Sequence, residues 1–201
     1  MNTAEKLAEI FKMFPGIGER QAKRFVHFLM SRNPHFINEL SDLLLDLQKG
    51  TRQCKECFRF YTLQPGGKND VCDICSDSHI DSTTLLVIER DSDLESIKKS
   101  GTYEGKYFVL GGLVPIVEKN TQKFVRIKEL KERLQKGGVK EVILAFTLSP
   151  QGDHTDHYLR SELGDLKSDL KISSLGRGLS TGTELEYSDN DTIRNALKNR
   201  Q

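Results

Sequence analysis

The stretch Cys54-Lys55-Glu56-Cys57, followed by Cys72-Asp73-Ile74-Cys75, holds every cysteine of this 201-residue chain, in two CxxC pairs separated by 14 residues. This spacing is typical of a closed zinc site, in which four thiolates surround one tetrahedral Zn²⁺ and leave no position for a reacting water. Disulfides are the alternative, but a CxxC loop is too tight for an unstrained structural bridge. We therefore expect Cys54, Cys57, Cys72 and Cys75 to bind one structural Zn²⁺, which supplies much of the folding energy of its small segment.

The bulk composition is that of an ordinary soluble globular protein, with 36% hydrophobic and 29% charged residues. A formal net charge of +1 gives no global attraction to nucleic acid, so DNA binding requires a local basic patch. The N-terminal residues do not follow the pattern of a signal peptide, and apolar runs such as 85–88 are too short to span a bilayer. We expect a cytoplasmic protein with reduced thiols and no membrane partner.

The first ~50 residues carry the apolar spacing of three helices. Asn2 or Thr3 is expected to cap the first helix, and Asn33 with Pro34 is expected to start the third. Each helix has an apolar stripe that we expect to face inward: Leu7, Ile10, Phe11 and Phe14; then Ala22, Phe25, Val26, Leu29 and Met30; then Phe36, Ile37, Leu40, Leu44 and Leu47.

The turn Pro15-Gly16-Ile17-Gly18 separates the first two helices and leaves bare amide groups at the start of the second. Free amides and the helix dipole together attract phosphate. The second helix also carries a basic stripe at helical spacing: Arg20, Lys23, Arg24 and His27. A solvated helix face is the alternative, but segment 14–25 resembles a helix-hairpin-helix motif, which binds DNA phosphates. We expect DNA contacts from Gly16, Gly18, Arg20, Lys23 and Arg24, with His27 at the boundary.

From about residue 80 the pattern changes to strands that alternate with helices. Strands are predicted over 84–88, 107–110, 139–146 and 170–174, and helices over 93–100, 127–136 and 153–163. This alternation favours a parallel sheet with right-handed crossovers. The glycine-containing tail from about residue 176 is predicted to end in a short helix after Asp189 or Asp191.

Carboxylates follow the predicted strands, where open parallel sheets place their sites. Glu89 ends the first strand, and Asp91 and Asp93 come directly after it, while Asp153 and Asp156 follow the third strand. Cleavage of phosphodiesters with Mg²⁺ needs several such groups.

This region resembles a Toprim domain, and Glu89 matches the glutamate that follows the first strand of that family. The Asp-x-Asp pair of the family is absent from 147–158. One interpretation is a weak Mg²⁺ site at Glu89, Asp93 and Asp153, without chemistry or with residual nuclease activity. The other, which we favour, is structural, with Asp153 capping a helix and Glu89 making an ion pair or hydrogen bond. His154 and His157 are expected to be surface histidines.

A helix-hairpin-helix, a four-cysteine finger and a Toprim-like sheet, in this order over nearly the whole chain, resemble the RecR family of recombination mediators. Segments 101–112, 138–145 and 177–189 are similar to sequences of that family. Arg90-Asp91 departs from its usual acidic-proline pair, and Gln151-Gly152-Asp153 departs from its usual Glu-Gly-Glu or Glu-Gly-Asp. Both departures argue against a metal role for the Toprim acids.

The resemblance implies an α+β chain of several parts. These are a helix-hairpin-helix DNA-binding region over 1–52, a zinc finger over 53–79, a Toprim domain with an α/β parallel sheet over 80–175, and a C-terminal segment over 176–201 that packs on a neighbouring subunit. It implies a binding protein without turnover that forms a ring, commonly a homotetramer, around single-stranded or duplex DNA. Its partners would be RecO, and RecF where present, and its task would be to load RecA onto single strands at gaps.

Two other function classes stay open at this point. One is a Mg²⁺-dependent Toprim nuclease or primase-like enzyme that uses Glu89 and Asp93. The other is a scaffold whose zinc finger binds only protein.

Overall fold

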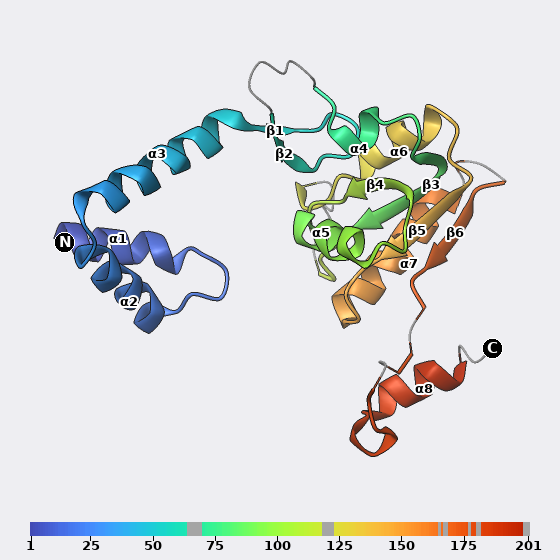
Figure 1. Cartoon of the computed structure of the whole chain (residues 1–201). Coiled ribbons are helices and arrows are strands. Elements are labelled where there is room, and N and C mark those ends of the chain that lie inside the picture. The colour runs from blue at the N-terminus through green and yellow to red at the C-terminus, as the bar shows by residue number, and fades with distance from the viewer. Residues whose placement is uncertain are drawn as a thin grey trace. The chain divides into compact units, whose positions relative to one another are not determined.

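The structure is a computed structural model that describes residues 1–63, 70–117, 123–164, 166, 169–176, 178–179 and 182–198, without the side chains of residues 191 and 198. The chain forms two compact units, Met1–Thr51 and Arg52–Gln201 (Figure 1). The four cysteines belong to the same unit as the large sheet. The domain boundaries at 52, 79 and 175 stay a prediction.

The first unit consists of helices α1 (Thr3–Lys12), α2 (Glu19–Met30) and α3 (Pro34–Gly50). The side chain of Asn2 caps α1 in a capping box, and that of Asn33 caps α3, directly before Pro34, as the sequence predicts. A small core joins α1 to α2; its buried residues are Ala8, Ala22 and Val26.

The apolar stripe of α3 does not face a core, so this part of the sequence prediction is wrong for the single chain. No residue of α3 is buried, and the side chains of Leu44 and Leu47 leave 58% and 55% of their surface exposed. Phe36 and Ile37 are exposed as well, and Leu40 is half-buried. Periodicity shows that one side of a helix needs an apolar partner, but it does not say which chain supplies that partner.

The second unit is built on a four-stranded parallel sheet in the order β4-β3-β5-β6 (Figure 1). The strands are β3 (Asp81–Ile88), β4 (Gly105–Val109), β5 (Glu141–Ala145) and β6 (Lys171–Ser174). Leu86 of β3 pairs with Tyr107 of β4 and with Ile143 of β5. The parallel sheet expected from the alternating pattern is therefore confirmed.

One face of the sheet is covered by α6 (Ile127–Gln135) and α7 (Pro150–Gly164). Leu130 of α6 and Leu159 of α7 lie in the same buried cluster as Leu85 and Phe108 of the sheet. Helix α7 starts at Pro150, three residues before the predicted start at Asp153. The hydroxyl of Ser149 accepts from the amide of Gly152, so Ser149 caps the helix and Pro150 takes its first position.

The other face of the sheet is covered by α5 (Asp91–Ser100) and by the cysteine segment. Leu86 and Val109 of the sheet share a buried cluster with Leu94 of α5 and with Cys57 and Cys72. Parallel sheets need cover on both faces, and here the cysteine segment provides part of it. It contains β1 (Thr51–Gln53), β2 (Phe60–Thr62) and α4 (Asp73–Ser76), and β1 pairs with β2.

The tail contains a short 3₁₀ helix, Leu185–Tyr187, and α8 (Asn190–Lys198), which agrees with the predicted C-terminal helix. Among the described residues, no helix has the length and apolar character needed to cross a membrane.

Candidate metal centre and nucleic-acid interface

The four cysteine sulfurs converge on one point. Their Sγ atoms all lie within 4.8 Å of one another, and those of Cys57 and Cys72 are 3.6 Å apart. Four thiolates at the usual zinc–sulfur distance would be separated by about 3.8 Å. In the described part of the chain, no other set of cysteine, histidine and carboxylate groups gathers in this way. The cysteines are free thiols rather than disulfides, so the residues present fit a closed tetrahedral metal site.

Local backbone structure holds the sulfurs in place. The amide of Phe58 donates to the carbonyl of Cys54 at 3.0 Å and closes the first CxxC turn. Cys72 precedes the first residue of α4, so that Cys75 follows one helical turn later. The amides of Glu56 and Cys72 lie 3.4 and 3.3 Å from the Cys54 sulfur. Hydrogen bonds within the cluster hold the pKa of Cys54 far below its usual range and raise the pKa values of Cys57 and Cys75, so without a metal the four sulfurs share their protons unequally.

The first cysteine pair is attached to the sheet by several contacts. The carbonyl of Cys57 accepts from the amide of Val109 at 2.8 Å, which extends the hydrogen bonding of β4. The Phe58 ring packs against Phe108, and Arg133 of α6 forms an ion pair with Glu56 at 2.7 Å. The metal segment is therefore not an independent finger; it shares its core with the α/β unit.

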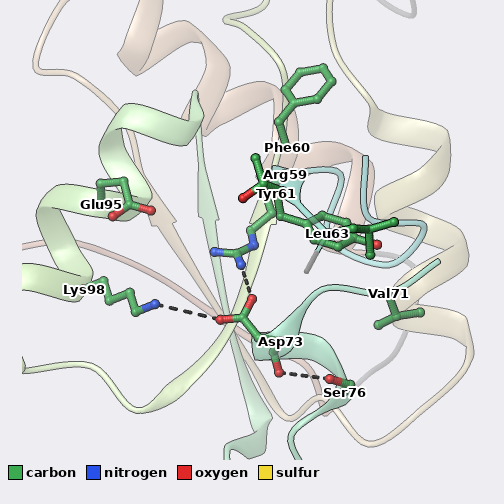
Figure 2. A pocket seen from close by; sticks show the side chains of 10 residues that line it. Arg59, Phe60, Tyr61, Leu63, Val71, Asp73, Ser76, Glu95 and Lys98 are labelled. Carbon is green, nitrogen blue, oxygen red and sulfur yellow. Dashed lines mark hydrogen bonds and ion pairs between the residues drawn. The ribbon is translucent and has the colours of Figure 1, made fainter. Parts of the chain in front are cut away.

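A cavity of about 610 Å³ adjoins the metal centre between β2 and α5 (Figure 2). Arg59 and Lys98 approach the carboxylate of Asp73 from two sides; Lys98 Nζ lies 4.0 Å from it. Glu95 also lines this cavity. The cavity is therefore lined by charged groups of both signs, and the ion pairs at Asp73 leave it without a strong preference for an anion or a cation.

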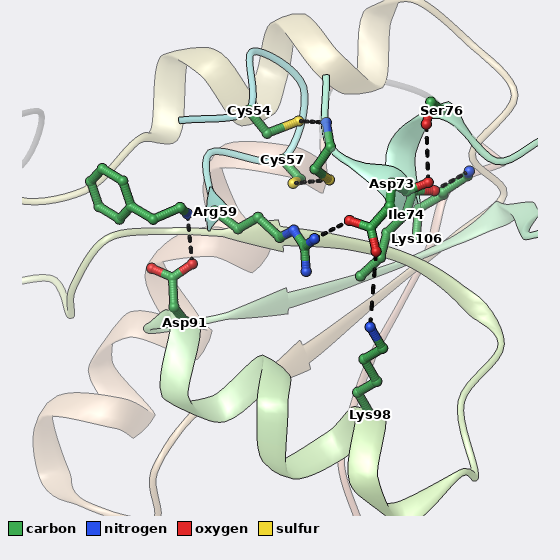
Figure 3. A network of polar contacts seen from close by, with 11 residues as sticks. Cys54, Cys57, Arg59, Asp73, Ile74, Ser76, Asp91, Lys98 and Lys106 are labelled. Carbon is green, nitrogen blue, oxygen red and sulfur yellow. Dashed lines mark hydrogen bonds and ion pairs between the residues drawn. The ribbon is translucent and has the colours of Figure 1, made fainter. Parts of the chain in front are cut away.

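The second cysteine pair is held by a buried lysine. Lys106 Nζ, on β4, donates to the carbonyl oxygen of Ile74 at 2.7 Å (Figure 3). It also donates to the carbonyl oxygens of Cys75 at 3.3 Å and Asp77 at 2.6 Å. The carboxylate of Asp91 accepts from the amide of Phe60 at 2.9 Å, which fixes the strand that follows the first cysteine pair.

The sequence analysis did not single out Arg59 or Lys106. The available signal was a lysine inside a strand whose other residues are apolar or glycine.

The predicted DNA-binding residues gather at the start of α2. Gly16 adopts a positive φ of 76°, and Gly18 occupies the N-cap position, where no side chain caps the helix amides. Arg20, Lys23 and Arg24 are all exposed. Lys23 forms an ion pair with Glu19 at 2.5 Å, so the two arginines carry the less compensated charge. His27 is also exposed on this helix. The assignment of these residues to DNA stays a prediction.

The predicted acidic residues make protein contacts. Glu89 is buried and pairs with Arg90 at 2.7 Å, and the carboxylate of Asp93 accepts from the Arg90 amide at 2.9 Å. The expectation that Asp153 caps a helix is wrong, because Asp153 lies within the first turn of α7 and Ser149 provides the cap. Asp156 pairs with Arg160 at 2.6 Å. The contacts of Glu89 and Asp93 support the structural interpretation. A weak Mg²⁺ site at Glu89, Asp93 and Asp153 stays a hypothesis, since these carboxylates do not form a ligand group among the described residues.

Comparison with known proteins identifies the family of this chain. The Toprim domain family matches residues 83–175. The recombination protein RecR of Syntrophobacter fumaroxidans is 34% identical over 93% of this chain and 89% of its own length. RecR of Dehalococcoides mccartyi is 34% identical over 98% of the chain and 92% of its own length, and RecR of Ureaplasma urealyticum is 30% identical over 98% and 94%. With its four-cysteine centre and its Toprim sheet, the chain belongs to the RecR family.

Proposed function

We propose that this protein is a DNA-binding mediator of recombinational repair that works by binding rather than by turnover. The observation that carries the proposal is the exposed cationic side of α2, which begins at an uncapped glycine turn. Backbone amides at a helix start, with Arg20 and Arg24 beside them, suit DNA phosphates of any sequence. The relatives are named recombination proteins, which agrees with this role.

The four-cysteine centre holds one structural Zn²⁺ in this proposal. Cys54, Cys57, Cys72 and Cys75 would bind it as thiolates, and the metal supplies a fixed crosslink between the two halves of the segment. All four ligand positions are filled by protein, so the centre offers no place for a substrate.

The functional form is a ring, most simply a homotetramer. Exposed leucines along α3 support this, because an apolar helix side of this extent usually marks a protein interface. One subunit presents few cations and would bind DNA weakly. Several hairpins around one DNA multiply the phosphate contacts and raise the effective concentration. The C-terminal segment 176–201 would pack on the Toprim region of a neighbouring subunit.

Within the cell the ring would act in the cytoplasm with RecO, and with RecF where present. Together they would help to load RecA onto single-stranded DNA at gaps. Contacts with these partners belong to the Toprim surface in this proposal.

A Mg²⁺-dependent Toprim nuclease is the second candidate, favoured by the burial of Glu89 at the carboxyl end of β3. One experiment separates the two. The purified protein and the Glu89→Gln variant are incubated with an end-labelled, single-strand-tailed duplex in Mg²⁺, and each reaction is split between native and denaturing gels. A retarded band with intact strands, the same for both proteins, is expected for the mediator. Shortened strands that disappear with Glu89→Gln would establish the nuclease, and unretarded DNA at low salt would reject DNA binding.

A further inference from the structure

With zinc bound, the metal centre would carry a buried net negative charge. Four thiolates around Zn²⁺ carry a net charge of −2, and Cys54, Cys57 and Cys72 are fully buried. A buried charge without compensation is strongly unfavourable. Some groups of the protein must therefore balance the centre.

Arg59 is the first buried cation beside it. Arg59 is only 7% exposed, and its buried Nε has no hydrogen-bond partner among the described residues. Its Nη2 pairs with Asp73 (Figure 3). The backbone carbonyl of Arg59 accepts from the amide of Cys54 at 2.9 Å, and its ion-pair partner Asp73 directly follows Cys72 in the chain. The buried guanidinium is thus attached to both cysteine pairs of the metal segment.

Lys106 is the second buried cation. It is 5% exposed, and within the described part of the chain it donates hydrogen bonds to the backbone carbonyls of Ile74, Cys75 and Asp77. An ammonium group has three donors, so these three carbonyls use all of them. In the described part of the chain Lys106 forms no ion pair with a carboxylate. Its positive charge is shared between the exposed carboxylate of Asp77 and the buried thiolates.

Asp73 adds a further negative charge beside the centre. It is largely exposed and pairs both with Arg59 and with the exposed Lys98, whose Nζ lies 4.0 Å from its carboxylate. Water screens the exposed Asp73 and Lys98, so among these groups the buried Arg59 and Lys106 oppose the net charge of the metal centre most strongly.

We propose that Arg59 and Lys106 are positioning residues that neutralise the buried four-thiolate metal centre, and that Lys106 couples metal occupancy to the docking of the second cysteine pair on β4. This inference rests on the metal site of the proposed function, but not on DNA binding. Loss of either cation leaves a net charge buried with the metal. Substitution of groups that support metal ligands typically lowers the metal affinity about 10- to 100-fold.

The test measures zinc affinity by competition with a chromophoric chelator, using the full-length protein without DNA. Arg59→Met is expected to lower the affinity about 10- to 100-fold, whereas Arg59→Lys, which keeps the charge, retains most of it. Lys98→Met is the matched control, because it removes an equal charge near the same Asp73 from an exposed position, and it is expected to leave the affinity unchanged. The cobalt-substituted proteins are compared by absorption, so that each variant is shown to keep four thiolate ligands.

Lys106 is tested by hydrogen exchange at the amides of Ser76 and Asp77, which close α4. Zinc removal is expected to speed exchange there in the wild type, and Lys106→Met is expected to speed it even in the zinc-loaded protein. Wild-type affinity in Arg59→Met, equal losses in Arg59→Met and Arg59→Lys, or unchanged exchange in Lys106→Met would each overturn the proposal. A wild-type protein that binds no zinc would instead refute the metal site. DNA binding is measured in a separate experiment, so its failure would not affect this result.

Discussion

The rings of Phe58 and Phe108 pack edge to face, with centroids 5.5 Å apart and planes inclined by 61°. Phe58 has a backbone φ of 61°, a left-handed conformation that costs a residue with a side chain about 1–2 kcal/mol. Its side chain also lies under Arg126, whose guanidinium carbon is 5.5 Å from the ring centroid. The strained turn persists because its side chain joins the first cysteine pair to the core of the sheet.

Two substitutions at Phe58 separate packing from strain. Phe58→Ala should destabilise the zinc-loaded protein by about 2–3 kcal/mol, because the half-buried ring is lost while the strain remains. Phe58→Gly loses the same ring but adopts the left-handed conformation freely, so it should be about 1 kcal/mol more stable than Phe58→Ala. Urea denaturation of the three proteins measures both differences. A glycine variant less stable than the alanine variant would contradict this account of the turn.

Loss of one metal ligand should affect the whole second unit. Cys54→Ser is expected to abolish stable zinc binding and to destabilise the fold, because the cysteine segment covers one face of the sheet. Zinc content by atomic absorption and a thermal melt of each protein measure the two effects. Chelation of zinc from the wild type should reproduce the lower melting temperature. Full stability without bound metal would refute a structural role for zinc.

The basic side of α2 should determine DNA affinity. Changing Arg20 and Arg24 together to Ala should weaken binding strongly and flatten its dependence on salt, because fewer counterions are released from the DNA. The log–log slope should fall by about 2 for each hairpin that contacts DNA. Both positions are exposed, so thermal stability should not change.

Lys128→Ala with Lys136→Ala is the matched control for this experiment, since it removes two exposed cations, one in α6 and one at its C-cap. It is expected to leave the salt slope near that of the wild type. Equal affinity for the α2 variant and the wild type would reject the hairpin as the DNA contact.

The exposed side of α3 should be an assembly surface. Leu44→Glu with Leu47→Glu should reduce the size of the oligomer in sedimentation, because two carboxylates would have to be buried without partners. Val117→Glu is the control, since this residue is almost fully exposed in the second unit. If sedimentation shows an unchanged oligomer, α3 does not form the interface.

Gly152 should tolerate no side chain. A Cβ at this position would lie 2.0 Å from the carbonyl oxygen of Thr147, so Gly152→Ala must shift the start of α7. A cost of about 1–3 kcal/mol is expected, as in other overpacked sites. Gly164→Ala, at the other end of the helix, has open space and should be close to neutral. Equal stabilities of the two variants by urea denaturation would show that the loop adapts freely.

Local sequence signals determined much of this fold. The caps at Asn2 and Asn33, the glycine turn before α2 and the alternation of strands with helices all depend on residues close together in the chain. The four cysteines were equally readable, because their spacing places two ligands on each short turn. The start of α7 was placed too late, although Ser149 and Pro150 carried the signal for it.

Tertiary structure alone decided which surfaces these elements meet. The inward side predicted for α3 is exposed, whereas the cysteine segment, expected to draw much of its folding energy from the metal, shares the apolar core of the sheet. Arg59 and Lys106 read as ordinary surface cations until the fold buries them beside the thiolates. Periodicity and spacing record local geometry, but burial and charge compensation depend on residues that are distant in the chain, and only the folded structure brings those together.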